Sequence, residues 1–252
     1  MKGKKEIKEL VKDRYGRIAS NEDSCCSCCS CDTDPVEQAK SIGYSVQEII
    51  NIPEGSAMGL GCGNPTALAG LKSGETVLDL GSGGGVDVFL ASRKVGEQGN
   101  VIGVDMTTGM VEKARENARK GNYTNVEFRA GEIENLPVED CSIDVVMSNC
   151  VVNLSPDKFA TFREVFRVLK PNGRILISDI VIEGELPGDV RRSLDAWTEC
   201  IAGALEKQEY LNTITKAGFR DVTIVAEHSF YNPEMDDRIA GKVISVQVRA
   251  HK

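Results

Sequence analysis

The stretch LDLGSGGG, residues 78–85, joins an apolar run to the helical pattern VDVFLASRKV of residues 86–95. A strand that ends in a glycine-rich turn exposes backbone N–H groups, and glycine lets the chain approach a ligand without a Cβ in the way. Gly81 and Gly83 fit the dinucleotide-binding pattern G-x-G-x-x-G/A, but Val86 replaces its last small residue. A plain tight turn would have the same glycines. The stretch by itself therefore indicates only a candidate loop for a small-molecule cofactor.

The segments that follow strengthen this interpretation. NVIGVDM, residues 100–106, is an apolar run that reaches Asp105, about 20 residues after the glycines, where a carboxylate accepts hydrogen bonds from ribose hydroxyls. NVEFRAGEIENLP, residues 125–137, predicts a strand followed by Glu132 and Ile133. The spacing D-x-G-x-G-x-G that begins at Asp79 resembles the first motif of S-adenosylmethionine (SAM) methyltransferases. In that pattern, an acidic or polar residue and an apolar residue after the third strand flank the adenine.

Strand and helix patterns alternate from about residue 75 to 180, which favours a parallel sheet covered on both faces. We predict an α/β fold of the class I SAM-dependent methyltransferase type, Rossmann-like, with a mostly parallel seven-stranded sheet. Residues 186–205 and 207–219 are expected to form two helices, and 220–230 with 242–250 an antiparallel pair at the sheet edge. The expected division is 1–50, N-terminal helices and a Cys-rich loop; 51–180, the SAM-binding core; and 181–252, a small α+β cap with the edge strands.

The length, the net charge and the distribution of apolar residues exclude several classes of function. The 252 residues suffice for one core of ordinary size or a core with a small cap. The formal net charge of −8 argues against a nucleic-acid partner. The sequence has no run of 18 apolar residues and its basic N-terminus lacks the apolar centre of a signal peptide, so we expect a cytoplasmic protein without a membrane span. Nothing in the sequence calls for more than a monomer.

Nine cysteines are unusual for a chain expected in a reducing compartment. Five lie in CCSCCSC, residues 25–31, which predicts a metal-binding, redox-active or disordered thiol-rich loop. The nearest alternative, a tetrahedral zinc site, lacks a second Cys or His pair at the usual distance, because His228 and His251 both lie near the C-terminus.

Three of the single cysteines are candidates for chemistry. Cys150 follows the fourth predicted strand, and ligands of open α/β sheets bind beyond the carboxyl ends of the strands. Cys62, in the turn GLGCGNP, and Cys200, on a helix of the C-terminal cap, are expected to close over the same crevice. Cys141 precedes the fourth strand and belongs to the opposite end of the sheet. The structural alternative for each lone cysteine is an inert core position.

Several thiols expected beside the sulfonium of SAM favour a methyl acceptor that needs no general base. Methylation of oxygen or nitrogen usually benefits from a base such as His, and neither His lies near the core motifs. A soft ion with three ligands and a free lone pair needs only thiolates that hold it and direct the lone pair. Trivalent arsenic meets this description.

Nearly the whole chain, from RYGRIA at 14–19 to about Phe219, resembles the microbial arsenite methyltransferases. The resemblance lies in GLGCGNP at 59–65, SNCVVNLSPDK at 148–158, REVFRVLKPNGR at 163–174 and ECIAGAL at 199–205. It implies transfer of methyl groups from SAM to trivalent arsenic, and methylated arsenicals as products. It also implies that cysteine pairs supply electrons by forming disulfides, which thioredoxin or a small thiol then reduces.

The resemblance also assigns site residues. Cys150 and Cys200 match two arsenic-binding cysteines and Cys62 a third, and one cysteine of the N-terminal cluster, with Cys31 or Cys26 chosen as guesses, would be a fourth. The cluster is denser than the family needs, so some of its thiols capture metalloid, bind another metal or have no catalytic role. The positions that match the SAM site are Asp79, Gly81, Ser82, Gly83, Asp105, Met106, Thr107, Glu132, Ile133 and Asn149.

Two alternatives remain open from the sequence. A methyltransferase for a quinone, or for another carbon or oxygen acceptor, would have the same fold and cofactor motifs. A thiol-rich protein that sequesters metalloid or metal would leave LDLGSGGG and Asp105 unexplained. The expected partners are therefore arsenite or its thiol conjugates and a thiol reductant.

Overall fold

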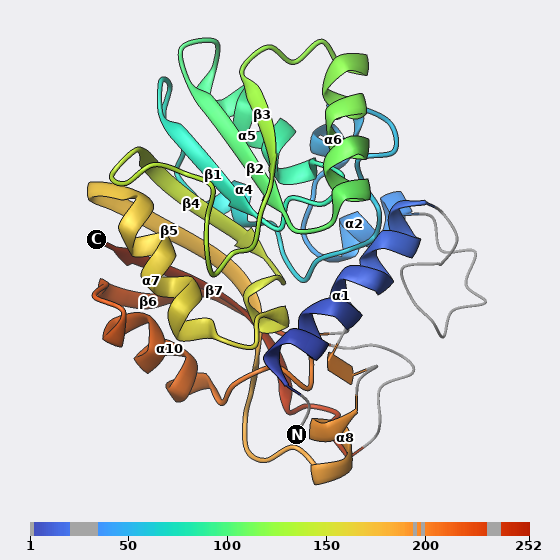
Figure 1. Cartoon of the computed structure of the whole chain (residues 1–252), viewed down its shortest axis with the longest axis vertical. Coiled ribbons are helices and arrows are strands. Elements are labelled where there is room, and N and C mark those ends of the chain that lie inside the picture. Colours follow the sequence, from blue (N-terminus) through green and yellow to red (C-terminus); the bar gives the residue numbers. More distant parts are fainter. Residues whose placement is uncertain (1–2, 21–34, 194–195, 198–199, 231–237) are drawn as a thin grey trace.

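The computed structural model describes residues 3–20, 35–193, 196–197, 200–230 and 238–252. A seven-stranded sheet with the order β3-β2-β1-β4-β5-β7-β6 forms its centre (Figure 1). Strand β7 runs antiparallel to β5 and β6, whereas the other neighbours are parallel. The predicted fold class, including the antiparallel pair at the edge, is confirmed. The strands are β1 Thr76–Leu80, β2 Asn100–Asp105, β3 Val126–Ala130, β4 Ile143–Asn149, β5 Leu169–Ile182, β6 Arg220–Ser229 and β7 Val243–His251.

Helices cover both faces of the sheet (Figure 1). Alternating residues of β1 show why: Val77 packs with the helix residue Phe89 on one face, and Leu78 packs in the cluster that contains Phe162 and Tyr210 on the other. No helix in the described part of the chain has the length and apolar composition needed to cross a bilayer. The helices are α1 Lys4–Ala19, α2 Pro35–Ser41, α3 Val46–Ile50, α4 Pro65–Leu68, α5 Val86–Val95, α6 Thr108–Lys120, the 3₁₀ turn η1 Val152–Leu154, α7 Lys158–Val168, α8 Gly188–Arg192 and α10 Lys207–Lys216.

Helix α1 crosses the loops that follow the parallel strands. Its Lys4 ammonium lies 2.6 Å from the Asp157 carboxylate, just before α7, and its Lys8 ammonium lies 2.6 Å from Glu132 and 3.0 Å from Glu134, after β3. The Lys4–Asp157 pair is the more exposed of these and contributes little stability, whereas Lys8 and Glu134 are both half-buried. Together they fix the helix over the end of the sheet where the glycine-rich turn lies.

The predicted helix over residues 186–205 is wrong in its extent. Helix α8 ends at Arg192, because Ser193 is extended (ψ 132°), and Cys200 adopts a left-handed φ of 66° that no α-helix accommodates. Ile201 and Ala204 are instead buried in the cluster that also contains Cys62. Burial of these apolar side chains against the sheet outweighs the local helical pattern.

Candidate active site

The turn after β1 is built for glycine. Gly81, Gly83 and Gly85 have φ values of 62°, 48° and 97°, a region that side chains with a Cβ rarely adopt. A Cβ on Gly81 would lie 2.4 Å from a methyl carbon of Val151. The backbone of the loop therefore approaches the pocket more closely than any other residue type would allow.

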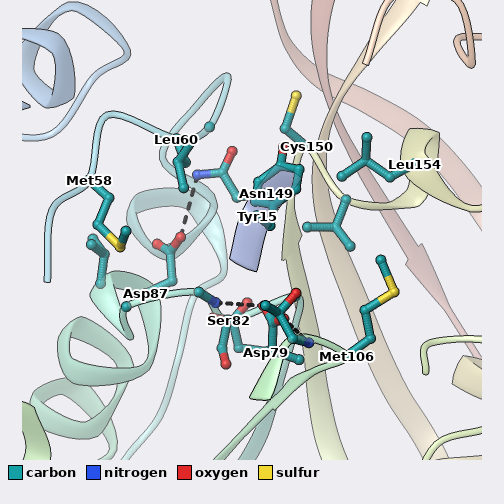
Figure 2. Close-up of a pocket in the computed structure, with 18 of the residues that line it drawn as sticks. Tyr15, Met58, Leu60, Asp79, Ser82, Asp87, Met106, Asn149, Cys150 and Leu154 are labelled. Carbon is teal, nitrogen blue, oxygen red and sulfur yellow. Dashed lines mark hydrogen bonds between the residues drawn. The ribbon is translucent and has the colours of Figure 1, made fainter. Parts of the chain in front are cut away.

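Asp105 at the end of β2 braces this turn. Its carboxylate accepts hydrogen bonds from the Gly83 N–H at 3.0 Å and from the Thr107 N–H at 2.8 Å. These bonds fix the carboxylate at the rim of the pocket (Figure 2 shows the neighbouring Asp79, Ser82 and Met106). A carboxylate held in this way retains lone pairs for hydroxyl donors such as those of a ribose.

The pocket brings together nine of the ten residues that the sequence assigns to the SAM site, and Glu132 is not among its lining residues. The Glu132 side chain is 54% exposed and is paired with Lys8. Helix α1 contributes Lys8, Val11 and Tyr15 to the wall. These residues could not be predicted from the sequence, because α1 is distant in the chain from every cofactor motif.

Three carboxylates crowd the pocket. Burial raises the pKa of Asp79 well above its usual value, and the negative charges of Asp87 and Asp105 raise it further. Burial also raises the pKa values of Asp87 and Asp105. A bound cation would relieve this repulsion, so the pocket favours a positively charged ligand.

Asp87 anchors a hydrogen-bond network that the sequence did not reveal, although its place in the first turn after the glycines was a signal. Its carboxylate accepts from the Tyr44 hydroxyl at 2.9 Å and the Thr66 hydroxyl at 2.7 Å. Asn149 at the end of β4 extends the network, because its amide donates to Asp87 at 3.4 Å (Figure 2). The same amide donates to the Gly63 carbonyl at 2.7 Å, and the side-chain oxygen of Asn149 accepts from the Cys62 N–H at 3.0 Å. Asn149 thus ties the cofactor pocket to the turn that contains Cys62.

The structure brings Cys62, Cys150 and Cys200 together beyond β4. The Cys150 thiol lies next to both other thiols, and their proximity, with burial, raises its pKa well above the usual value. Burial raises the pKa of Cys62 as well. The Cys200 thiol donates to the Cys150 carbonyl at 2.9 Å. Cys150 and Cys200 both have left-handed backbones, each costing about 1–2 kcal/mol, which the surrounding fold must offset.

A fourth polar group lies against these thiols. Asp179 on β5 is fully buried, and one of its carboxylate oxygens, Cys62 Sγ and Cys150 Sγ all lie within 4.8 Å of one another. Burial raises its pKa to about 7. The sequence did not single out this residue, since an acidic residue in a strand is common.

The other cysteines named from the sequence are Cys141, Cys26 and Cys31. Cys141 is exposed at the start of β4, as expected from the sequence, and lies 3.7 Å from the Lys252 ammonium. Cys26 and Cys31 lie outside the described residues, so their role stays a prediction.

Comparison with known proteins identifies the family. A profile described as a methyltransferase domain matches residues 71–218. An arsenite methyltransferase of Halobacterium salinarum is 44% identical over 261 residues, which cover 98% of this chain and 67% of the relative. The crystal structure of an arsenic(III) S-adenosylmethionine methyltransferase from Chlamydomonas reinhardtii matches with a TM-score of 0.70 and 34% identity, over 88% of this chain and 75% of that one. The chain belongs to the arsenite methyltransferase family.

The relatives extend beyond the matched part. The human arsenite methyltransferase is 38% identical over 189 residues, 70% of this chain but 50% of its own length. A demethylmenaquinone methyltransferase of Lactococcus lactis matches only 41% of this chain, at 38% identity. The similarity to the arsenite methyltransferase family is therefore broader than the similarity to quinone methyltransferases.

The cofactor of the family, SAM, fits the pocket. The molecule presents a ribose diol, an ammonium group and a sulfonium. The diol suits the Asp105 carboxylate, and the two positive charges suit the three buried carboxylates. The glycine turn leaves room for close approach of the backbone.

Proposed function

We propose that this protein transfers methyl groups from SAM to trivalent arsenic held by Cys62, Cys150 and Cys200. The observation that carries the proposal is the convergence of three thiols from distant parts of the chain beside a pocket that favours a cation. Arsenite binds as its three hydroxyls leave as water with the three thiol protons, so binding needs no external base. Methylated arsenicals would be the products.

The chain's residues divide the work between two ends of the site. We assign cofactor binding to Asp79, Asp105 and the glycine turn, with Met106, Thr107 and Ile133 along the wall. Bound there, SAM supplies a methyl group activated by the adjacent sulfonium. The three thiolates make arsenic pyramidal and leave its lone pair free as the nucleophile, so their role is orientation. This accounts for a site without a histidine base among the described residues that line it.

Methyl transfer formally removes two electrons from arsenic. Two thiolates that join as a disulfide release two electrons, which would return arsenic to the trivalent state. The contact of the Cys150 thiol with both other thiols supports such a pairing. A thiol reductant, either thioredoxin or a small thiol, would then regenerate the free thiols.

The test is arsenic methylation by purified protein with SAM, arsenite and a thiol reductant, followed by chromatographic separation and elemental detection of the arsenic species. Cys150→Ser should abolish methylation but leave SAM affinity within a few fold, and Cys141→Ser is the matched control. Full turnover by Cys150→Ser would contradict the assigned role. SAM binding without any methylated arsenic from the unmodified chain would move the acceptor to carbon or oxygen.

A further inference from the structure

Asp179 gives the thiol cluster a donor that arsenic does not need. Trivalent arsenic is satisfied by three thiolates, whereas Cys62 Sγ, Cys150 Sγ and an Asp179 oxygen already lie within 4.8 Å of one another, and the Cys200 thiol beside them donates to the Cys150 backbone carbonyl. Four sulfur and oxygen donors around one point are the usual environment of a tetrahedral Zn²⁺. The cluster therefore holds one ligand too many for its proposed substrate and the right number for zinc.

The dimensions of the cluster suit a small cation. With Zn–S bonds of about 2.3 Å, neighbouring sulfurs of a tetrahedral site lie about 3.8 Å apart. A contraction of about 1 Å would bring Cys62 Sγ, Cys150 Sγ and the Asp179 oxygen, now within 4.8 Å of one another, close to this distance. Cys200 Sγ lies outside this group, and rotation of its side chain away from the Cys150 carbonyl would bring it in as the fourth donor.

The Asp179 carboxylate is oriented as metal-binding carboxylates are. One oxygen accepts from the Tyr210 hydroxyl at 3.0 Å and from the Asn153 N–H at 3.1 Å, while the other accepts from the Ile180 N–H at 3.0 Å. Tyr210 and Asn153 are themselves fully buried. Such surrounding hydrogen bonds hold a ligand in place for an ion and strengthen its binding.

We propose that Cys62, Cys150, Cys200 and Asp179 form a binding site for a thiophilic divalent cation, Zn²⁺, which competes with arsenite. The competition rests on the proposed function, but the cation site does not. Each thiol that binds the metal gives its proton to solvent, and no electron moves. Zinc would thus act as an inhibitor that keeps the thiols reduced and occupied.

The test uses the full chain with the five N-terminal cysteines, at 25, 26, 28, 29 and 31, changed to Ser, because these thiols would bind metal themselves. Co²⁺ added to this reduced protein should give thiolate-to-cobalt charge-transfer bands and the intense visible bands of a tetrahedral ion, at one ion per chain. Zn²⁺ should bleach the spectrum, and arsenite should bleach it at one equivalent. Cys141→Ser in the same background is the control and should keep the spectrum. A chain that shows no tetrahedral spectrum would overturn the proposal.

Asp179→Asn separates the cation from the metalloid. It should raise the ratio of the Co²⁺ to the arsenite dissociation constant about tenfold or more, since the carboxylate serves the cation alone. An unchanged ratio would overturn the role of Asp179. X-ray absorption at the cobalt edge in the protein that retains Asp179 gives a second measurement, in which a shell of sulfur mixed with oxygen supports the site and an all-sulfur shell overturns it. Arsenic methylation without Co²⁺ binding would refute this inference and leave the proposed function intact.

Discussion

Replacing Asp179 with Asn should remove a large part of the pH dependence of folding. The folded protein holds the pKa of this fully buried carboxyl at about 7, against 3.8 for the free side chain. A raised pKa means that the folded state binds the proton more tightly than the unfolded chain. The resulting stability is present in full below about pH 4 and is lost as the pH rises through about 7.

The size of the effect follows from the two pKa values. Linkage between them gives a loss of about 3 kcal/mol between pH 5 and pH 8 from this one group. Asparagine does not titrate, so the variant should lack this contribution even though its amide disturbs the bond from the Ile180 N–H. The comparison between pH values cancels any constant cost of the substitution.

Urea unfolding followed by circular dichroism, in EDTA and reductant at pH 5 and 8, measures the effect. The wild type should lose about 3 kcal/mol more than Asp179→Asn between these pH values. Asp13→Asn, at an exposed position on α1, is the matched control and should follow the wild type. Parallel profiles for the wild type and Asp179→Asn would refute the reasoning that burial governs this carboxyl.

Three further predictions concern the cofactor pocket and its link to the thiols. Gly81→Ala should weaken SAM binding about tenfold by calorimetry, because its Cβ would collide with Val151. The control Gly184→Ala has a similar left-handed φ of 86° but open space around it, so it should leave SAM affinity unchanged. Equal affinities of the two variants would show that the turn tolerates a Cβ. SAM affinity should rise with pH from acidic to neutral values. The pKa values of Asp79, Asp87 and Asp105 are raised, and the positive charge of SAM favours the ionised carboxylates. A flat pH profile would mean that these carboxylates do not face the charge of SAM. Asn149→Ala removes the side chain that bonds to the Cys62 N–H and the Gly63 carbonyl. The free energy of unfolding in urea should therefore fall by about 1–3 kcal/mol, and arsenite binding should weaken. Unchanged arsenite affinity would show that Asn149 is not needed to position Cys62.

The core of the fold was predictable from local sequence patterns. The apolar runs of β1, β2 and β4 are buried on both faces, and a strand of this kind is recognisable from composition alone. The capping box of Ser45 and Glu48 and the Asn64 cap of α4 are local features of the same kind. Each depends on a few neighbouring residues and not on distant parts of the chain.

The helix expected over residues 186–205 was predicted too long for the opposite reason. Its pattern is locally helical, but the positions of Ile201 and Cys200 are decided by what they pack against across the sheet. The same holds for Tyr15, which reaches the cofactor pocket from the first helix. No local signal carries such contacts.

The sequence by itself therefore determined the parallel sheet, the glycine turn and the acidic residue at the end of β2, because backbone conformation and strand burial depend on short-range sterics and on the period of apolar residues. Only the tertiary structure decided that Cys62, Cys150 and Cys200 meet, and that Asp179 lies against two of them. These residues come from four separate segments, and only burial of the sheet and its covering turns sets the distances between them. The sequence shows that the thiols are present, whereas the packing of the folded chain decides how many of them lie close together.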